Sequence, residues 1–199
     1  MEKELKYFDI EGSYGGNQKW FYDPIIRFCG CGAIVTCDIC IYLNLFKNIK
    51  NLYPFNIDCL NKEDFIKFSK IMRNYLHPKI NGISTLQLYI DGFKLYLEDI
   101  KCNEINIKPF SGVNCVDAAQ KIVMSQIDKE IPIPFLLLKH KNKELDEYVW
   151  HWFIIAGYKK TYGDLLVKVI TYGKYEWISF KELWDNGYEQ KGGMIIVDL

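Results

Sequence analysis

Four cysteines lie between residues 29 and 40, with the spacing C-x-C-x5-C-x2-C. Thiolates at Cys29, Cys31, Cys37 and Cys40 would make a ligand set that tetrahedral structural zinc accepts. Structural zinc sites usually take two ligands from each of two turns separated by a longer loop, whereas Cys37 and Cys40 lie inside one apolar run. We therefore keep a zinc site as the alternative and expect neither a metal nor an organic cofactor.

The cysteine count also argues against a disulfide framework. The 199-residue chain carries seven cysteines, an odd number, and it is much longer than the small secreted domains that disulfides hold together. We expect reduced thiols. Most of them should behave as small core residues, as buried free cysteine usually does: Cys37, Cys40, Cys59, Cys102 and Cys115.

Cys31 differs from the other cysteines by its position. The motif "GCGA" places it where a glycine-rich loop becomes a predicted helix. The positive end of the helix dipole favours the thiolate and lowers the pKa of a thiol there, and the thiolate is the reactive form. Cys29 lies two residues earlier, outside the helix start, and would gain less. Cys31 is therefore the candidate nucleophile.

A nucleophilic cysteine needs a base, and the chain has three histidines. His77 precedes a proline at a predicted helix end and His140 lies among lysines, which is typical of solvated surface residues. His151 begins the apolar run "HWFIIAGY" between Trp150 and Trp152, and these neighbours can shield an imidazole from water while it exchanges a proton. The sequence therefore favours His151 as the base.

These residues resemble the papain-like cysteine peptidase superfamily, especially its bacterial branch akin to bacteriocin leader-processing peptidases. In that superfamily a Gln or similar donor precedes a Cys at the start of a buried helix, and a His follows much later on a strand written "HW". The segments "GGNQKWF", "GCGA" and "HWFIIAGY" supply Gln18, Cys31 and His151 in this order. The resemblance implies a papain-like fold, attack of Cys31 on a carbonyl carbon, and an oxyanion held by Gln18 and the backbone N–H of Cys31. Asn17 is the alternative to Gln18.

The residue that would orient the histidine departs from the family pattern. Papain-like enzymes use an Asn or Asp before a Ser-Trp-Gly segment, whereas the comparable stretch here is "ITYG". If the runs around "KKTYGD" form a hairpin, Thr171 lies across from His151 on the same sheet face. A Thr hydroxyl can accept from an imidazole N–H, although it cannot stabilise an imidazolium as a carboxylate does. Asp164 is the second candidate, but it is expected in the turn.

The hydrophobic periodicity changes along the chain and predicts an α+β fold. Apolar residues recur at helical spacing in the first part, with Asn61 and Asn114 as candidate N-caps and Pro78 ending the second helix. From Pro132 onward the sequence consists of β-branched and aromatic runs separated by turn residues. The expected helices span residues 31–46, 62–76, 84–100 and 114–130, and the expected strands span 134–140, 149–158, 164–173, 175–180 and 193–199. We expect one domain over residues 1–199, with a mainly helical part (1–131) packed on an antiparallel sheet (132–199).

Composition narrows the function classes. Lys and Arg total 25 and so do Asp and Glu, so the chain has no net positive field for a nucleic acid. The first residues lack the apolar core of a signal peptide and no segment has the roughly 18 apolar residues of a membrane span, so we expect a cytoplasmic protein without membrane partners. Together with these exclusions, the resemblance implies a cysteine peptidase or amide hydrolase acting on a peptide or amide substrate. The alternatives are an acyltransferase on the same scaffold and a catalytically silent peptide-binding domain.

Overall fold

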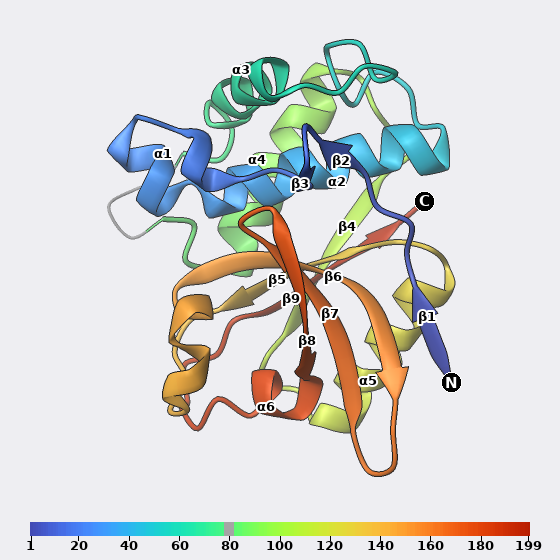
Figure 1. The fold of residues 1–199 in the computed structure, drawn as a ribbon, viewed down its shortest axis with the longest axis vertical. Coiled ribbons are helices and arrows are strands. Elements are labelled where there is room, and N and C mark those ends of the chain that lie inside the picture. The colour runs from blue at the N-terminus through green and yellow to red at the C-terminus, as the bar shows by residue number, and fades with distance from the viewer. Residues whose placement is uncertain (78–81) are drawn as a thin grey trace.

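The computed structural model describes residues 1–77 and 82–199, and it combines a layer of helices with an antiparallel sheet (Figure 1). The predicted α+β class is confirmed. The upper half of Figure 1 holds α1 (Pro24–Cys29), α2 (Cys31–Lys47), α3 (Lys62–Met72) and α4 (Leu86–Asp99). The lower half holds the sheet with α5 (Val116–Asp128) and α6 (Phe180–Trp184). No helix within the described ranges is long and apolar enough to span a bilayer.

Helix α2 is the central element of the helical layer. Every residue from Cys31 to Leu43 is buried, so the helix is covered on all sides, as expected of one that is apolar nearly all round. It ends at Asn48, whose left-handed conformation (φ 58°) lets its N–H donate to the Leu43 carbonyl oxygen. The predicted helix over residues 31–46 is therefore confirmed.

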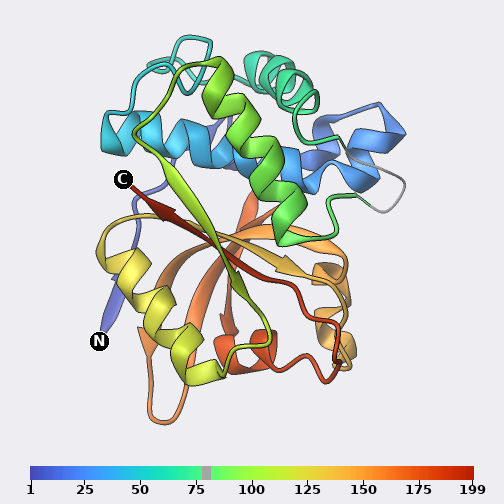
Figure 2. The ribbon, with the colours of Figure 1, turned by 180° about the vertical axis from the view of Figure 1, so that it is seen from behind.

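Within residues 1–77 and 82–199, seven strands form the main sheet, and all their pairings are antiparallel. The order is β4-β9-β5-β6-β7-β8, and β1 pairs with β6 beyond the end of β5. The strands are β1 (Glu2–Glu4), β4 (Asn106–Ser111), β5 (Ile133–Leu137), β6 (His151–Lys160), β7 (Leu165–Thr171), β8 (Lys174–Ser179) and β9 (Gly193–Asp198). Figure 2 shows α4 and α5 from behind, on either side of the strand β4. A separate small hairpin joins β2 (Asp9–Ile10) and β3 (Ser13–Tyr14).

The β6–β7 hairpin contains an irregularity that changes its register. Tyr158 faces Val167, but Ile155 faces Val169, so β6 carries one extra residue between these pairs. Gly157 lies in this stretch, and a Cβ there would come within 3.0 Å of the Lys3 carbonyl oxygen. A glycine is therefore needed where β1 approaches the bulged strand.

Several sequence-based boundaries need correction. The Asn61 side chain accepts from the backbone N–H of Asp64 as predicted, but α3 ends at Met72 rather than near residue 76, and Pro78 lies outside the described residues. Cys115, not Asn114, is the N-cap of α5, and no side chain caps that end. The Asn114 amide instead donates to the Ser111 carbonyl oxygen. Strands also occur before residue 132, because β4 pairs along its whole length with β9.

Candidate active site

A cavity at the start of α2 brings four of the predicted site residues together. Its walls come from the loop after β3, from α2, and from the facing ends of β6 and β7. About 280 Å³ of space free of protein atoms, part of it open to solvent, lies between these walls. Its lining residues are Gly16, Gln18, Cys31, Ile34, Val35, Asp38, His151, Trp152, Ile154, Ile170 and Thr171. Residues more than 130 positions apart in the sequence thus line one cavity.

Cys31 is the first residue of α2 and is 5% exposed. The helix start has no side-chain cap, since its N-cap is Gly30. Burial raises the pKa of the Cys31 thiol to about 11, although backbone N–H groups of Trp152, Gly32 and Cys31 itself act in the opposite direction. The expected fall in pKa at the helix N-terminus is therefore outweighed by desolvation, and Cys31 is a neutral thiol in the free protein near pH 7.

His151 begins β6 and contacts the Thr171 side chain directly. The His151 Nε2 and Thr171 Oγ1 atoms are 2.6 Å apart, as the sequence predicted for an orienting residue. The predicted register of β6 and β7, with Thr171 directly across from His151, is wrong. Ile154 pairs with Ile170, and continuing this pairing sets Thr171 opposite Phe153 and diagonal to His151. A diagonal pair on one face is still within reach. With a proton on Nε2 donated to the hydroxyl, Nδ1 becomes the basic nitrogen.

An aromatic ring covers the imidazole. The rings of His151 and Tyr172 are stacked with centroids 4.7 Å apart and planes 8° apart. Burial lowers the pKa of His151 to about 4, so the ring is neutral near pH 7. Trp150, which precedes His151, and Tyr172, which follows Thr171, both have left-handed backbone, with φ of 54° and 51°. Such conformations are unusual for bulky residues, and they concentrate here at the two chain segments that present His151 and Thr171.

Gln18 reaches the cavity from a short helix, η1 (Gln18–Trp20), that follows β3. Its Nε2 donates to the Arg27 carbonyl oxygen over 2.9 Å, which fixes the carboxamide close to the turn that leads to Cys31. Asn17 has a different task, because its Oδ1 accepts from the Lys19 backbone N–H as the N-cap of η1. The structure therefore places Gln18, and not Asn17, in the wall of the cavity.

Asp38 is the cavity residue that sequence reasoning missed. It lies two helical turns after Cys31 and is 3% exposed. Its carboxylate accepts from the Gly16 backbone N–H and from the Tyr7 hydroxyl. Burial raises its pKa to about 7, against the opposing effect of these hydrogen bonds. A lone aspartate within the apolar run "AIVTCDICIYL" was the available signal, since a buried carboxylate needs partners.

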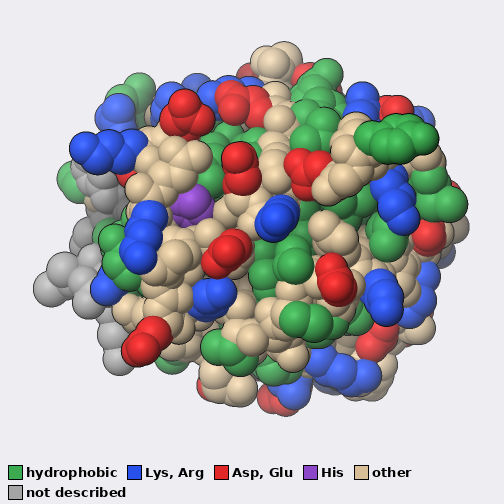
Figure 3. All heavy atoms as spheres, turned by 90° about the horizontal axis from the view of Figure 1, so that it is seen from below, with side chains coloured by type: hydrophobic (Ala, Val, Ile, Leu, Met, Phe, Trp, Pro, Cys, Tyr) green, Lys and Arg blue, Asp and Glu red, His purple; other side chains and the backbone are tan. Residues whose placement is uncertain are grey.

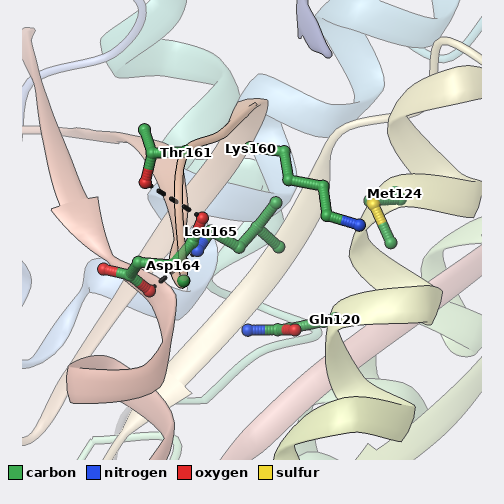
Figure 4. A pocket seen from close by; sticks show the side chains of 7 residues that line it. Gln120, Met124, Lys160, Thr161, Asp164 and Leu165 are labelled. Atoms are coloured by element: carbon green, nitrogen blue, oxygen red, sulfur yellow. Dashed lines mark hydrogen bonds between the residues drawn. The ribbon is translucent and has the colours of Figure 1, made fainter.

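Asp164, the second candidate for orienting His151, lies elsewhere. It lies in the turn between β6 and β7, where its Oδ1 accepts from the Leu165 backbone N–H. Figure 4 shows it at a groove between that turn and α5, together with Lys160, Gln120 and Met124. Asp164 does not line the Cys31 cavity, which is at the other end of the hairpin.

The other cysteines differ in exposure, and Cys29 and Cys102 are only partly buried. Cys37 and Cys40 are fully buried in α2, as expected of small core residues. The same expectation is wrong for Cys59 and Cys115, which are exposed. Within residues 1–77 and 82–199, no group of three or more His, Cys, Asp or Glu side chains is arranged to hold a metal ion.

Charged side chains of both signs are mixed on the surface. Figure 3 views the end of the molecule that carries α6 and the β6–β7 turn, and basic, acidic and apolar side chains alternate over its coloured part. The totals of 25 basic and 25 acidic residues agree with this balance. This face therefore lacks the single-sign field that steers a highly charged ligand.

Comparison of the chain with protein-family models, curated proteins and solved structures gives no match. The structure itself defines the fold class as α+β with an antiparallel sheet. A proposal on function therefore has to be argued from the cavity and its chemistry.

Proposed function

We propose that the protein is a papain-like cysteine hydrolase that cleaves a peptide or amide bond through a covalent acyl-enzyme. The observation that carries the proposal is the shared cavity of Cys31, His151, Thr171 and Gln18. These side chains correspond in type to a nucleophile, a base, an orienting residue and an oxyanion donor, which is the set that acyl transfer requires.

The first step follows from the protonation states. Cys31 is a neutral thiol and His151 a neutral imidazole near pH 7, because burial acts on both in the direction of the uncharged form. His151 Nδ1 therefore takes the thiol proton as the sulfur attacks the carbonyl carbon, as a general base. Thr171 keeps the ring oriented through the bond to Nε2. The negative charge then moves to the substrate oxygen.

The oxyanion would lie at the N-terminus of α2. The backbone N–H of Cys31 is among the first N–H groups of that helix, which lack intrahelical partners. The Gln18 carboxamide lines the same cavity and is fixed by its bond to the Arg27 carbonyl oxygen. When the tetrahedral intermediate collapses, His151 gives its proton to the leaving amine and the acyl group stays on the Cys31 sulfur. Water, activated by the same imidazole, then releases the acid.

One observation favours a second candidate, a peptide-binding domain without turnover. A Thr hydroxyl replaces the amide or carboxylate that the resemblance leads one to expect beside the histidine. It orients the ring without stabilising the imidazolium. A buried thiol with a pKa of about 11 is also a weak nucleophile unless proton transfer accompanies its attack.

Peptide turnover distinguishes these candidates. The protein is incubated with a pool of synthetic peptides of mixed sequence, and products are followed by mass spectrometry. We expect cleavage by the wild type, loss with Cys31→Ala or His151→Ala, and no change with Cys29→Ala, the neighbouring cysteine that does not line the cavity. Equal products from wild type and Cys31→Ala would reject the hydrolase. Added glycinamide tests for an acyltransferase, whose acyl group would leave on the amine.

A further inference from the structure

The buried carboxylate of Asp38 links the helix of the nucleophile to the loop of the oxyanion donor. Asp38 Oδ1 and Oδ2 lie 3.0 and 3.2 Å from the Gly16 backbone nitrogen. Gly16 precedes Gln18 by two residues, and Asp38 follows Cys31 on the same helix. A single side chain thus sets the distance between the segment that carries Gln18 and the helix that begins at Cys31.

The loop is built around this contact. A Cβ at Gly15 would lie 2.7 Å from Asp38 Oδ2, and a Cβ at Gly16 would lie 2.8 Å from Oδ1 and 2.0 Å from the Phe65 ring. Only glycine therefore lets the backbone approach the carboxylate this closely. The next residue, Asn17, is the N-cap of η1. The position of Gly16 therefore determines where the turn that contains Gln18 begins.

The start of the same loop is hydrogen-bonded to the turn between β7 and β8, which lies beside His151. The Tyr14 backbone N–H donates to the Gly173 carbonyl oxygen over 2.9 Å. Gly173 follows Tyr172, whose ring stacks on His151. Between these points the Gly15 N–H donates to the Phe8 carbonyl oxygen over 3.1 Å, and the Gly16 N–H, bonded to Asp38, is the last of these loop attachments before η1.

We propose that Asp38 is a positioning residue for the reaction, which holds Gly16 against α2 so that the Gln18 carboxamide is aimed at the oxyanion formed on Cys31. The inference rests on the proposed function for its catalytic consequence, but the positioning itself is a property of the loop. Asp38 lines the same cavity, but its carboxylate is bonded to Gly16 and Tyr7, so the role assigned to it is exerted through Gln18.

Two reactions of the same sulfur separate this role from a general loss of structure. Acylation of Cys31 by p-nitrophenyl acetate passes through an oxyanion, whereas alkylation by iodoacetamide does not. Asp38→Leu keeps the approximate size and removes both acceptors. We expect it to slow acylation about 100-fold, as misplacement or loss of an oxyanion donor does, and to change alkylation by less than about 3-fold. Asp38→Asn, which keeps an acceptor for Gly16, should retain the rate to within about 5-fold.

The pathway through Gln18 is tested by combining variants. If Asp38 acts through Gln18, the double variant Asp38→Leu/Gln18→Ala acylates no more than about 3-fold slower than Gln18→Ala alone. Effects that multiply would overturn the proposal, and so would an Asp38→Leu protein that acylates at the wild-type rate. If Asp38→Leu does not fold, Gly16→Ala displaces the same contact from the loop side and should give the same difference between acylation and alkylation. Gly12→Asn is the matched control, because no atom lies within 4 Å of its Cβ position and Asn tolerates left-handed backbone such as that of Gly12 (φ 84°).

Failure of the proposed function remains distinguishable from failure of this inference. A wild type that acylates no faster than Cys31→Ala would reject the hydrolase and leave the loop to be measured directly. NMR of the Gly16 amide and the Gln18 side-chain amide provides this measurement. We expect faster hydrogen exchange at Gly16 and shifted Gln18 signals in Asp38→Leu or Gly16→Ala, and unchanged values in Gly12→Asn. Wild-type exchange and shifts in the two loop-displacing variants would overturn the positioning role whatever the activity.

Discussion

Replacing Asp38 by Asn should make the protein more stable at pH 8 while leaving its stability almost unchanged at pH 4. Burial raises the pKa of this carboxyl from its ordinary value of 3.8 to about 7 in the folded protein. The folded state therefore binds a proton more tightly than the unfolded chain does. The stability from this group is fully present below about pH 3.8 and is lost as the pH rises towards 7.

The magnitude follows from the distance between these two pKa values. At about 1.36 kcal/mol per pH unit, ionising the buried carboxyl lowers the free energy of unfolding by roughly 4 kcal/mol. Asn resembles the protonated acid in shape and does not titrate. The difference in unfolding free energy, Asp38→Asn minus wild type, should therefore rise from near zero at pH 4 to a few kcal/mol at pH 8.

The difference between the proteins is more informative than the wild-type curve. Burial lowers the pKa of His151 from 6.5 to about 4, so its contribution to stability is present above pH 6.5 and is lost as the pH falls towards 4. This opposes the Asp38 effect in the same pH range and flattens the wild-type profile. Urea denaturation of both proteins at one-unit pH steps separates the two groups. A difference that is constant from pH 4 to 8 would refute the reasoning.

Three further variants or reactions test other parts of the account. Alkylation of Cys31 by iodoacetamide, followed by peptide mass spectrometry, should accelerate steadily with pH up to at least pH 9, because burial raises the thiol pKa to about 11. A rate that reaches its plateau below pH 7 would indicate a preformed ion pair instead. Thr171→Ala should lower kcat for peptide cleavage by about 10-fold or more. Thr171→Ser keeps the hydroxyl beside His151 Nε2, so its kcat should stay within a few-fold of the wild-type value. An equal loss of kcat in both variants would exclude the orienting role. Cys37→Ala should lower the free energy of unfolding by about 1 to 2 kcal/mol through the space left in the core, and turnover should stay the same; zinc found in stoichiometric amount and lost with Cys37 would revive the metal alternative.

The elements with strong periodicity could be predicted from the sequence. The helical spacing of the apolar residues in α2 and the apolar, β-branched runs of β6 and β7 predicted the type and approximate position of these elements, although not the register between β6 and β7. Strand β4 was missed because Pro109 lies inside a run of only six residues, and a proline argues against a strand. Its place at the sheet edge, paired only with β9, explains why a proline is tolerated there.

The site was predictable as far as residue types determine it. Cys31, His151, Thr171 and Gln18 line one cavity, as the order of motifs suggested. The neutral state of the Cys31 thiol was not predictable. The sequence shows the helix N-terminus, which lowers the thiol pKa, but it does not show the depth of burial, which raises the pKa. Asp38 escaped notice for a related reason. Its partner, Gly16, lies in a loop whose path is fixed only by the folded structure.

The central claim is that Cys31 forms an acyl-enzyme with the help of His151, and trapping this intermediate tests it most directly. The protein is mixed with p-nitrophenyl acetate, quenched with acid within milliseconds, and mapped by peptide mass spectrometry. We expect one acetyl group on Cys31 in the wild type, formed at least about 100-fold more slowly in His151→Ala, with Cys29 unmodified in both. Acetylation of Cys31 at the same rate with and without His151, or acetylation mainly at Cys29, would contradict it.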